Sequence, residues 1–282
     1  MPETSAPERA AHAARMRLAH VNLSGQQLAD SIQAWMATDP IGGVTRVSDD
    51  RLSWELRWSV ALPQFDSWGL MFGDAVHNLR SMLDNFVYLI AESEGASAKE
   101  LKNVQFPVES DSERWAKVAK QRISMLPARV QNAIESVQPF QRPESEQQSD
   151  GLAILSSFNN GDKHRIAIVD SIAPRTVEHE FQVQFEDGAT VDGPPRTEFF
   201  AGPFEDGALA LRHETAPDRI KSVSGSGKFE ALVVIADEWG NQHGITSVLA
   251  GLATYVPMVL DVVLVAWTAP EVDVRAGGAR LT

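Results

Sequence analysis

The sequence contains no cysteine. This absence excludes disulfide bonds, thiolate zinc sites, iron–sulfur clusters and cysteine nucleophiles together. It fits a reducing compartment, and we expect a cytoplasmic protein. Residues 1–20 mix acidic and basic side chains without an apolar run, which argues against a secretory signal peptide.

Positive charge is scarce, since 25 Lys and Arg residues face 38 Asp and Glu residues and the net charge is −13. A field of this sign repels phosphate backbones, so extended non-specific binding of nucleic acid is disfavoured. A small basic pocket can still differ from the average. RNA or another phosphate-containing ligand therefore stays open as a partner, as does a homodimer.

Several motifs with a defined chemistry are missing. Gly-x-Ser-x-Gly does not occur, and the short glycine pairs at 42–43 and 225–227 form neither a phosphate loop nor a dinucleotide fingerprint. We expect Gly225-Ser226-Gly227 to be a turn. His-x-x-x-His and Glu-x-x-His are also absent, so we expect no metal and no cofactor, although Asp74 and His77 together with His164 or His243 leave a metal site as an alternative.

One long hydrophobic run is present at 245–269, where the only charged residue is Asp261. Its length would span a bilayer. Pro257 and Asp261 in its middle, and the lack of closely flanking Lys or Arg anchors, favour instead the buried helix of a large domain. We expect no membrane association, and a membrane span is the alternative.

The periodicity of apolar residues predicts an α+β fold. We expect N-terminal helices with a β-hairpin, a C-terminal antiparallel sheet and a final buried apolar helix, all in a single domain of residues 1–282. A polar stretch at 141–150 is a possible seam between a helical part (1–163) and a mainly β part (164–282). The helices are expected at 7–38 (with a possible break at Ser24-Gly25), 65–93, 112–122 and 127–137, with a helical turn or two at 151–158. The hairpin strands are expected at 44–47 and 52–62, and the later strands at 166–169, 181–185, 208–211, 220–223 and 229–235.

Polar residues on the predicted helix 65–93 recur in steps of three or four, which places them on one side. They are Asp74, His77, Ser81 and Asp84 or Asn85, with Arg80 within reach of His77 and Asp84. A histidine can move protons near neutral pH, and an arginine binds phosphate or carboxylate. The set has the parts of a phosphodiester-cleaving or phosphate-recognising site. The alternative is a structural Arg80–Asp84 pair beside a hydrogen-bonded histidine.

Ionisable residues also follow one another at Asp162, Lys163, His164 and Arg165, after Asn159-Asn160-Gly161. We expect this segment to be a loop that joins a short helix to the first strand of the β region. Alternation along the strand would then point Asp162 and His164 one way and Lys163 and Arg165 the other. A solvated turn is the alternative.

Three segments occur in a distinctive order: Gly73 to Asp84, Phe106-Pro107-Val108, and Asn160 to Arg165. In this order they resemble a family of uncharacterised proteins from actinobacteria and their phages, over about the first 170 residues. The resemblance implies a site and carries no known activity. The chain is also weakly similar to HEPN-type helical proteins, many of which are RNases that use an Arg, a short spacer and a His on one helix. Here Asn85 stands at the matching distance after Arg80 where that pattern has His.

Two hypotheses from different classes follow. In the first, the chain is a phosphodiester-directed enzyme of HEPN-like RNase type. In the second, it is a non-catalytic binding or regulatory protein whose polar cluster is structural. The candidate catalytic residues are His77, Arg80, Asp84 and His164, and the candidate substrate-binding residues are Asn78, Asn160, Asp162, Lys163 and Arg165.

Overall fold

The computed structural model describes residues 5–61, 63–164, 169–186, 196–215 and 217–270. The chain divides into two compact units. The helical unit comprises residues 1–24, 73–163 and 249–282, and the β unit comprises residues 25–72 and 164–248. The predicted α+β class is confirmed. The prediction of one domain with a seam at 141–150 stays a prediction.

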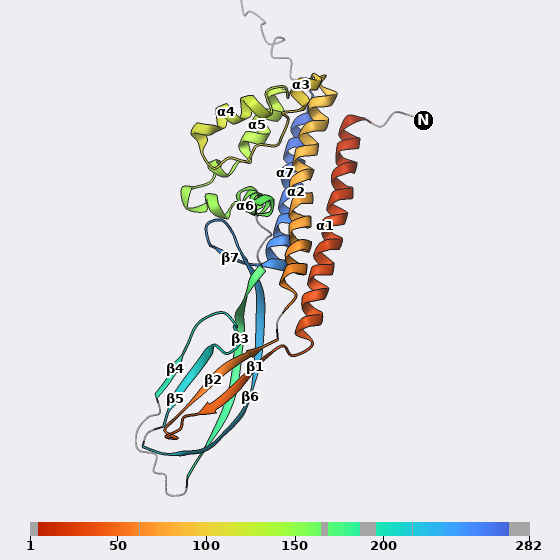
Figure 1. Cartoon of the computed structure of the whole chain (residues 1–282). Helices are drawn as coiled ribbons and strands as arrows, with labels where there is room; N and C mark the ends of the chain where they lie inside the picture. Colours follow the sequence, from red (N-terminus) through yellow and green to blue (C-terminus); the bar gives the residue numbers. More distant parts are fainter. Residues whose placement is uncertain (1–4, 62, 165–168, 187–195, 216, 271–282) are drawn as a thin grey trace, which may run out of the picture. The chain divides into compact units, whose positions relative to one another are not determined.

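The three long helices are α1 (Ala6–Met36), α2 (Phe65–Ser93) and α7 (Ile245–Thr268). Their parts at 6–24, 73–93 and 249–268 belong to the helical unit and lie side by side there (Figure 1). The predicted bounds of α2 are confirmed, and α1 runs through Ser24-Gly25 without a break. On the α7 side, the indole N–H of Trp267 donates to Glu94 at 3.2 Å, and its ring packs on Phe86. The expected return of the last helix to the N-terminal helices is therefore confirmed.

Shorter helices complete the helical unit: α3 (Ala98–Leu101), α4 (Ser112–Arg122), α5 (Ala128–Ser136) and α6 (Gly151–His164), with 3-10 turns η1 (Pro139–Gln141) and η2 (Glu144–Ser149). Asp111 caps α4, since its carboxylate accepts the N–H of Glu113 at 2.8 Å. Asp150 caps α6 in the same way through the N–H of Leu152 at 2.8 Å.

The prediction of a loop is wrong for residues 159–164, because α6 continues through His164. Gly161 does not terminate the helix, and the amide of Asn160 donates within it to the hydroxyl of Ser156, one turn earlier, at 3.4 Å. Strand-like alternation of Asp162 to His164 therefore does not apply. The side chains of residues 161–164, and Arg165 as a whole, lie outside the described residues.

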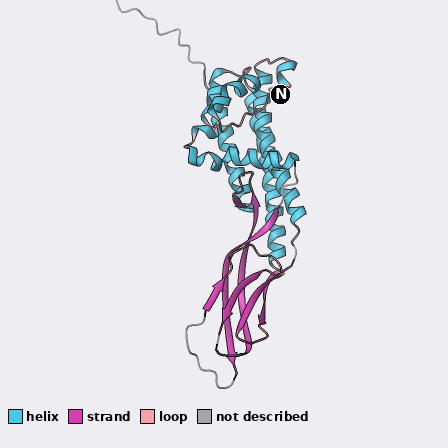
Figure 2. Ribbon diagram, turned by 60° about the vertical axis from the view of Figure 1, so that its left-hand side comes forward, coloured by secondary structure: helices cyan, strands magenta, loops and turns pink. Residues whose placement is uncertain are grey.

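The β unit contains two antiparallel sheets that enclose an apolar core (Figure 2). The four-stranded sheet has the order β1-β2-β5-β4 and joins the predicted hairpin to C-terminal strands. The three-stranded sheet has the order β3-β6-β7. Their bounds are β1 (Ile41–Val47), β2 (Ser53–Val60), β3 (Val169–Phe185), β4 (Arg196–Phe199), β5 (Leu209–Glu214), β6 (Ile220–Ala236) and β7 (Gln242–Gly244). Trp54, Leu56 and Trp58 of β2 point into the core, as their alternation predicts.

The turn predicted at Gly225-Ser226-Gly227 is wrong, because these residues lie inside β6. The strands predicted at 220–223 and 229–235 are consequently one 17-residue strand. Gly225 pairs with Phe181, and a Cβ atom there would collide with the backbone and ring of the opposite strand. A Cβ atom at Gly227 would collide with the ring of Phe229. These glycines therefore make room for aromatic side chains, as glycine does within strands.

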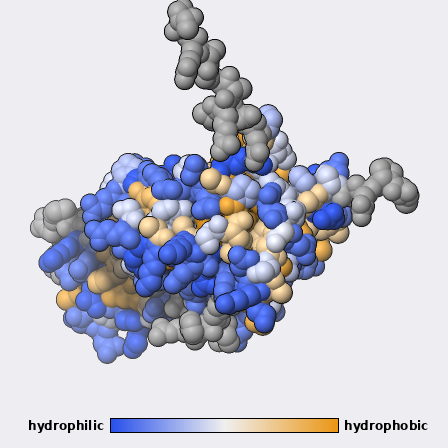
Figure 3. All heavy atoms as spheres, turned by 90° about the horizontal axis from the view of Figure 1, so that it is seen from above, coloured by the Kyte–Doolittle hydropathy of each residue, from blue (hydrophilic) through white to orange (hydrophobic). Residues whose placement is uncertain are grey.

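Helix α7 is buried along one side only, whereas we expected a fully buried helix. It has a mean hydropathy of 2.1 and is long enough to cross a membrane, by length and composition alone, with 33% of its apolar window buried. Met258, Val262 and Val265 are exposed. Apolar patches interrupt a mostly hydrophilic surface in Figure 3. The arrangement is compatible with a soluble protein in which α7 is a core helix.

Candidate functional site

A segment without regular secondary structure, residues 104–109, is tied to α2 by the predicted Arg80–Asp84 pair. Arg80 donates to both carboxylate oxygens of Asp84, from Nε at 3.2 Å and from Nη2 at 2.8 Å. Nη2 also donates to the carbonyl of Phe106, whose own N–H donates to Asp84 at 2.9 Å. The Arg80 residue is only 9% exposed. The pair therefore fixes the path of this segment, which is the structural role in our second hypothesis.

Gln138 holds the same segment from the other side. Its carbonyl oxygen accepts the N–H of Glu109 at 2.9 Å, and its amide nitrogen donates to the carbonyls of Pro107 and Ile134, each at 3.0 Å. The side chain is completely buried. A buried amide with all of these partners is a strong positional constraint, because each lost bond would leave a buried polar group unsatisfied.

These constraints shape a cavity of about 170 Å³, which we call the Phe106 pocket. Its walls come from α2, from the 105–109 segment, from α4 and from α6. The lining residues are Arg80, Gln105, Phe106, Pro107, Val108, Glu109, Val118, Arg122, Ser156, Asn159 and Asn160. All of them belong to the helical unit.

Three lining side chains have unused hydrogen-bonding capacity. Asn159 is 4% exposed, and its amide makes no hydrogen bond to the described residues. Arg122 has neither a hydrogen bond nor an ion pair with any described residue. Among the described residues, the carboxylate of Glu109 pairs with Arg114 alone, at 3.9 Å. Buried polar groups are normally satisfied, so unsatisfied groups that line one cavity indicate a place for a ligand or for water.

His77, Asn78 and Asp74 lie away from this pocket's lining. The carboxylate of Asp74 accepts from the ring of His20 at 3.1 Å, and the side-chain oxygen of Asn78 accepts from Arg17 at 3.2 Å. His77 is exposed and lies 3.5 Å from the hydroxyl of Ser81. Asp74 and Asn78 thus contact α1, whereas Arg80 and Asp84 contact the 104–109 segment.

Of the predicted site residues, Arg80 and Asn160 line the Phe106 pocket, and Asp84 supports it through Arg80. The side chains of Asp162, Lys163 and His164 and the whole of Arg165 lie outside the described residues, so the predicted approach of His164 to His77 and Arg80 stays a prediction. Sequence reasoning missed Glu109 and Arg122. The signal for Glu109 was its place directly after Phe106-Pro107-Val108, and Arg122 is the last residue of a correctly predicted helix.

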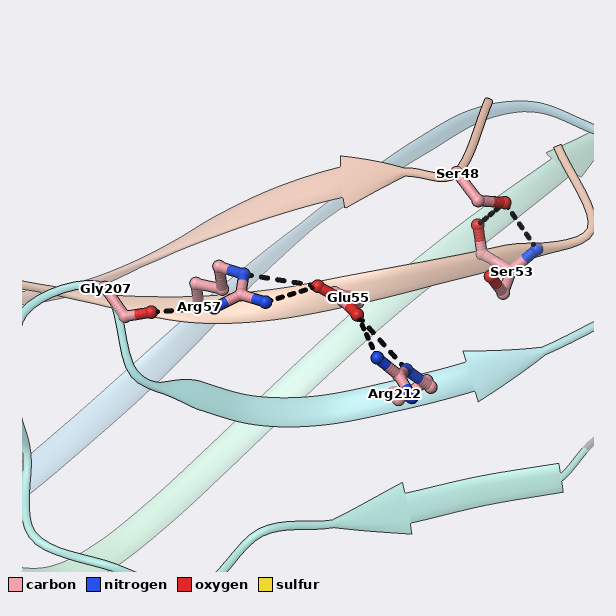
Figure 4. Close-up of polar contacts among 6 residues, drawn as sticks. All are labelled: Ser48, Ser53, Glu55, Arg57, Gly207 and Arg212. Carbon is pink, nitrogen blue, oxygen red and sulfur yellow. Dashed lines mark hydrogen bonds and ion pairs between the residues drawn. The ribbon is translucent and has the colours of Figure 1, made fainter. Parts of the chain in front are cut away.

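Another polar cluster lies on the four-stranded sheet (Figure 4). Glu55 accepts from Arg57 at 2.8 Å and from Arg212 at 2.6 Å, and these hydrogen bonds lower the pKa of Glu55 despite partial burial. Strand register continues the row, since Arg46 pairs with Glu55 and Glu198 with Arg212. Alternating charges across four strands stabilise a sheet through cross-strand pairs, so we assign this cluster a structural role.

His243, considered above for a metal site, bonds instead to Asp237 at 2.9 Å. Asp237 also accepts the N–H groups of Trp239 and Asn241 in the turn between β6 and β7. Burial raises the pKa of Asp237, but the hydrogen bonds outweigh it and the pKa lies below its usual value. Among the described residues, no group of three His, Asp or Glu side chains is arranged to hold a metal ion.

No protein-family model, curated protein or solved structure matches this chain. We therefore infer the function from the geometry of the Phe106 pocket.

Proposed function

We propose that the helical unit is a binding module that holds a small ligand by its phosphate or carboxylate group in the Phe106 pocket. The observation that carries this proposal is the presence of Arg122 and buried Asn159 in one cavity, both without a partner among the described residues. A guanidinium and an amide N–H together supply the donors that an anionic oxygen needs.

Arg80 supports the same chemistry from a fixed position. Its Nε and Nη2 are used by Asp84 and Phe106, while its Nη1 makes no hydrogen bond to the described residues. A guanidinium anchored in this way donates to a ligand without further loss of side-chain entropy. Its charge is already balanced by Asp84, so Arg122 contributes most of the net attraction for an anion.

The size of the pocket limits the ligand. About 170 Å³ is below the roughly 300–1,000 Å³ of pockets for drug-sized molecules and equals the liquid volume of roughly six waters. We therefore expect a small free anion, or the charged end of a longer molecule.

Phosphodiester cleavage has less support. In that hypothesis His77 is the general acid or base. A general base must lie within hydrogen-bond reach of the proton that it abstracts. His77 is not among the residues that line this pocket. Replacement of His77 by Ala tests the enzyme hypothesis directly, since loss of a nuclease activity at unchanged stability would revive it.

Isothermal titration calorimetry with inorganic phosphate and with butyrate tests the proposal. We expect binding of at least one probe, and a weakening of about 10- to 100-fold in Arg122→Gln, because a hydrogen bond to a charged group contributes about 1.5–3 kcal/mol. Lys117→Gln is the matched control, because it removes the same charge from an exposed position on α4 outside the pocket. Equal affinities in the two variants, or no binding of phosphate, of butyrate and of short carboxylates that also carry an ammonium group, would refute the proposal.

We also propose that the protein acts in the cytoplasm. We propose further that it belongs to the uncharacterised actinobacterial and phage family, because its three characteristic segments follow one another in the order typical of that family. The lack of cysteine supports the first, and the order of the Gly73–Asp84, Phe106–Val108 and Asn160–Arg165 segments supports the second.

A further inference from the structure

Glu109 is an acidic residue in a pocket that we assign to an anion. Its side chain is only 13% exposed, and its nearest basic group, Nε of Arg114, lies 3.9 Å away, which is too long for a hydrogen bond. Arg114 itself is 68% exposed, so water screens this contact. Largely buried carboxylates are rarely left without a partner, because burial penalises the charged form.

Two residues of opposite charge line the pocket without pairing with each other. Glu109 precedes α4, Arg122 is the last residue of that helix, and the basic group 3.9 Å from Glu109 belongs to Arg114 instead. Val118 of α4 lines the same pocket together with the apolar side chains of Pro107 and Val108. The pocket therefore offers a basic, an acidic and an apolar part of its lining to one ligand.

We propose that the ligand is a zwitterion, in which a carboxylate or phosphate and an ammonium group are joined by a short apolar chain. Arg122 and Asn159 hold the anionic group, Glu109 holds the ammonium group, and Val118 contacts the methylene groups between them. This inference rests on the proposed function, because it names the ligand class of the same pocket. A simple anion leaves Glu109 without a partner and is repelled by its charge. A zwitterion instead pairs its ammonium group with Glu109 and its anionic group with Arg122 and Asn159.

Matched pairs of probes test the inference by calorimetry on the full chain: butyrate against 4-aminobutyrate, and propanoate against β-alanine. Each pair differs only by the ammonium group. We expect at least one amino acid to bind about 10-fold or more tightly than its matched acid. The longer pair should show the larger gap, because Glu109 and Arg122 do not pair with each other and the longer chain sets the two charged groups of the ligand further apart.

Glu109→Gln separates the possible ligand classes by the sign of its effect. If the ligand is zwitterionic, the variant weakens 4-aminobutyrate about 10- to 100-fold and strengthens butyrate. If both probes bind more tightly to the variant, the pocket takes simple anions, the zwitterion inference is wrong and the proposed function stands. Absence of binding by phosphate and by all four organic probes overturns the inference and the proposed function together.

Arg114→Gln is a second variant that avoids the buried side chain. Arg114 is largely exposed, so its loss should leave the fold intact. Because it competes with the ligand for Glu109, its removal should strengthen 4-aminobutyrate about two- to fivefold and leave butyrate no tighter. Weaker binding of 4-aminobutyrate by this variant would contradict the assignment of Glu109 to the ammonium group.

Discussion

Replacement of Asp84 by Asn tests whether the Arg80–Asp84 pair holds the wall of the pocket. The new side chain keeps its shape but loses its charge, and it turns an N–H donor toward one of the groups that now donates to Asp84. Arg80 would remain 9% exposed without its counter-charge. Removing one partner of a buried pair costs about 3–5 kcal/mol, and the 29% exposure of the Asp84 side chain reduces this, so we expect a loss of about 2–4 kcal/mol.

Urea unfolding followed by the helical circular dichroism signal measures this loss, since the helical unit holds residues 73–163, which include both members of the pair. With a slope of about 2 kcal/mol per molar urea, the midpoint should fall by about 1–2 M. Hydrogen exchange should accelerate first at the N–H of Phe106, which loses its acceptor. The double variant with Arg80→Met should recover part of the stability, because the unpaired buried charge is gone.

Glu92→Gln is the matched control, because Glu92 is an exposed carboxylate on the same helix and has no hydrogen-bond partner for its side chain among the described residues. It should change the stability by less than about 0.5 kcal/mol. If Asp84→Asn behaves like this control, or if the double variant is no more stable than the single one, the pair does not hold the segment and the reasoning fails.

Two further predictions concern packing and pH. Gly151→Ala should destabilise the helical unit by about 1–3 kcal/mol, because the new Cβ would collide with the ring of Tyr255. Gly251→Ala on α7 meets no atom and should stabilise the unit by about 0.5–1 kcal/mol. Thermal unfolding of both variants checks this contrast, and equal effects would contradict it. Burial lowers the pKa of His213, which bonds to Thr197 at 2.7 Å. A lowered folded-state pKa gives stability that is present above the unfolded value of about 6.5 and is lost as the pH falls through the folded value. The β unit should therefore lose stability as the pH falls below about 6.5, less so in His213→Gln, and identical pH profiles for the two proteins would refute this.

Much of the fold was predictable because the strongest signals are local. The apolar positions of α2 repeat every three or four residues along 29 residues, and β2 alternates strictly, so both elements were predicted closely. The error at Gly225 to Gly227 has a long-range cause. Glycine in isolation predicts a turn, but here Phe181 on the opposite strand and Phe229 two residues on occupy the space that side chains would take. The approach of Phe181 is not contained in the neighbouring sequence, and without it the nearby Phe229 does not distinguish a strand from a turn.

In the candidate site, only the contact between residues of the same helix was predictable from the sequence. Arg80 and Asp84 are four residues apart, and their contact was predicted from that spacing. Glu109, Arg122 and Asn159 reach the same cavity from three separate segments. No periodicity relates such residues, and only the packing of α4 and α6 against the 105–109 segment brings them together.

The polar residues of α2 from Asp74 to Asp84 contact two different parts of the molecule, and their spacing along the helix explains why. Each residue turns the helix by about 100°, so steps of three and four return near the starting direction with errors of about −60° and +40°. From Asn78 to Arg80 the rotation is about 200°, which places these residues on different sides of the helix. Asn78 accordingly bonds to α1, and Arg80 bonds to Phe106. His77 projects from α2 between the directions of Asn78 and Arg80, and its side chain is exposed. Helical spacing that relates His77 to Arg80 therefore does not place it in the lining of the Phe106 pocket. The hydrogen bonds among Arg80, Asp84 and Phe106 fix the wall of the pocket. The proposed ligand contacts come from other side chains that line it, Glu109, Arg122 and Asn159.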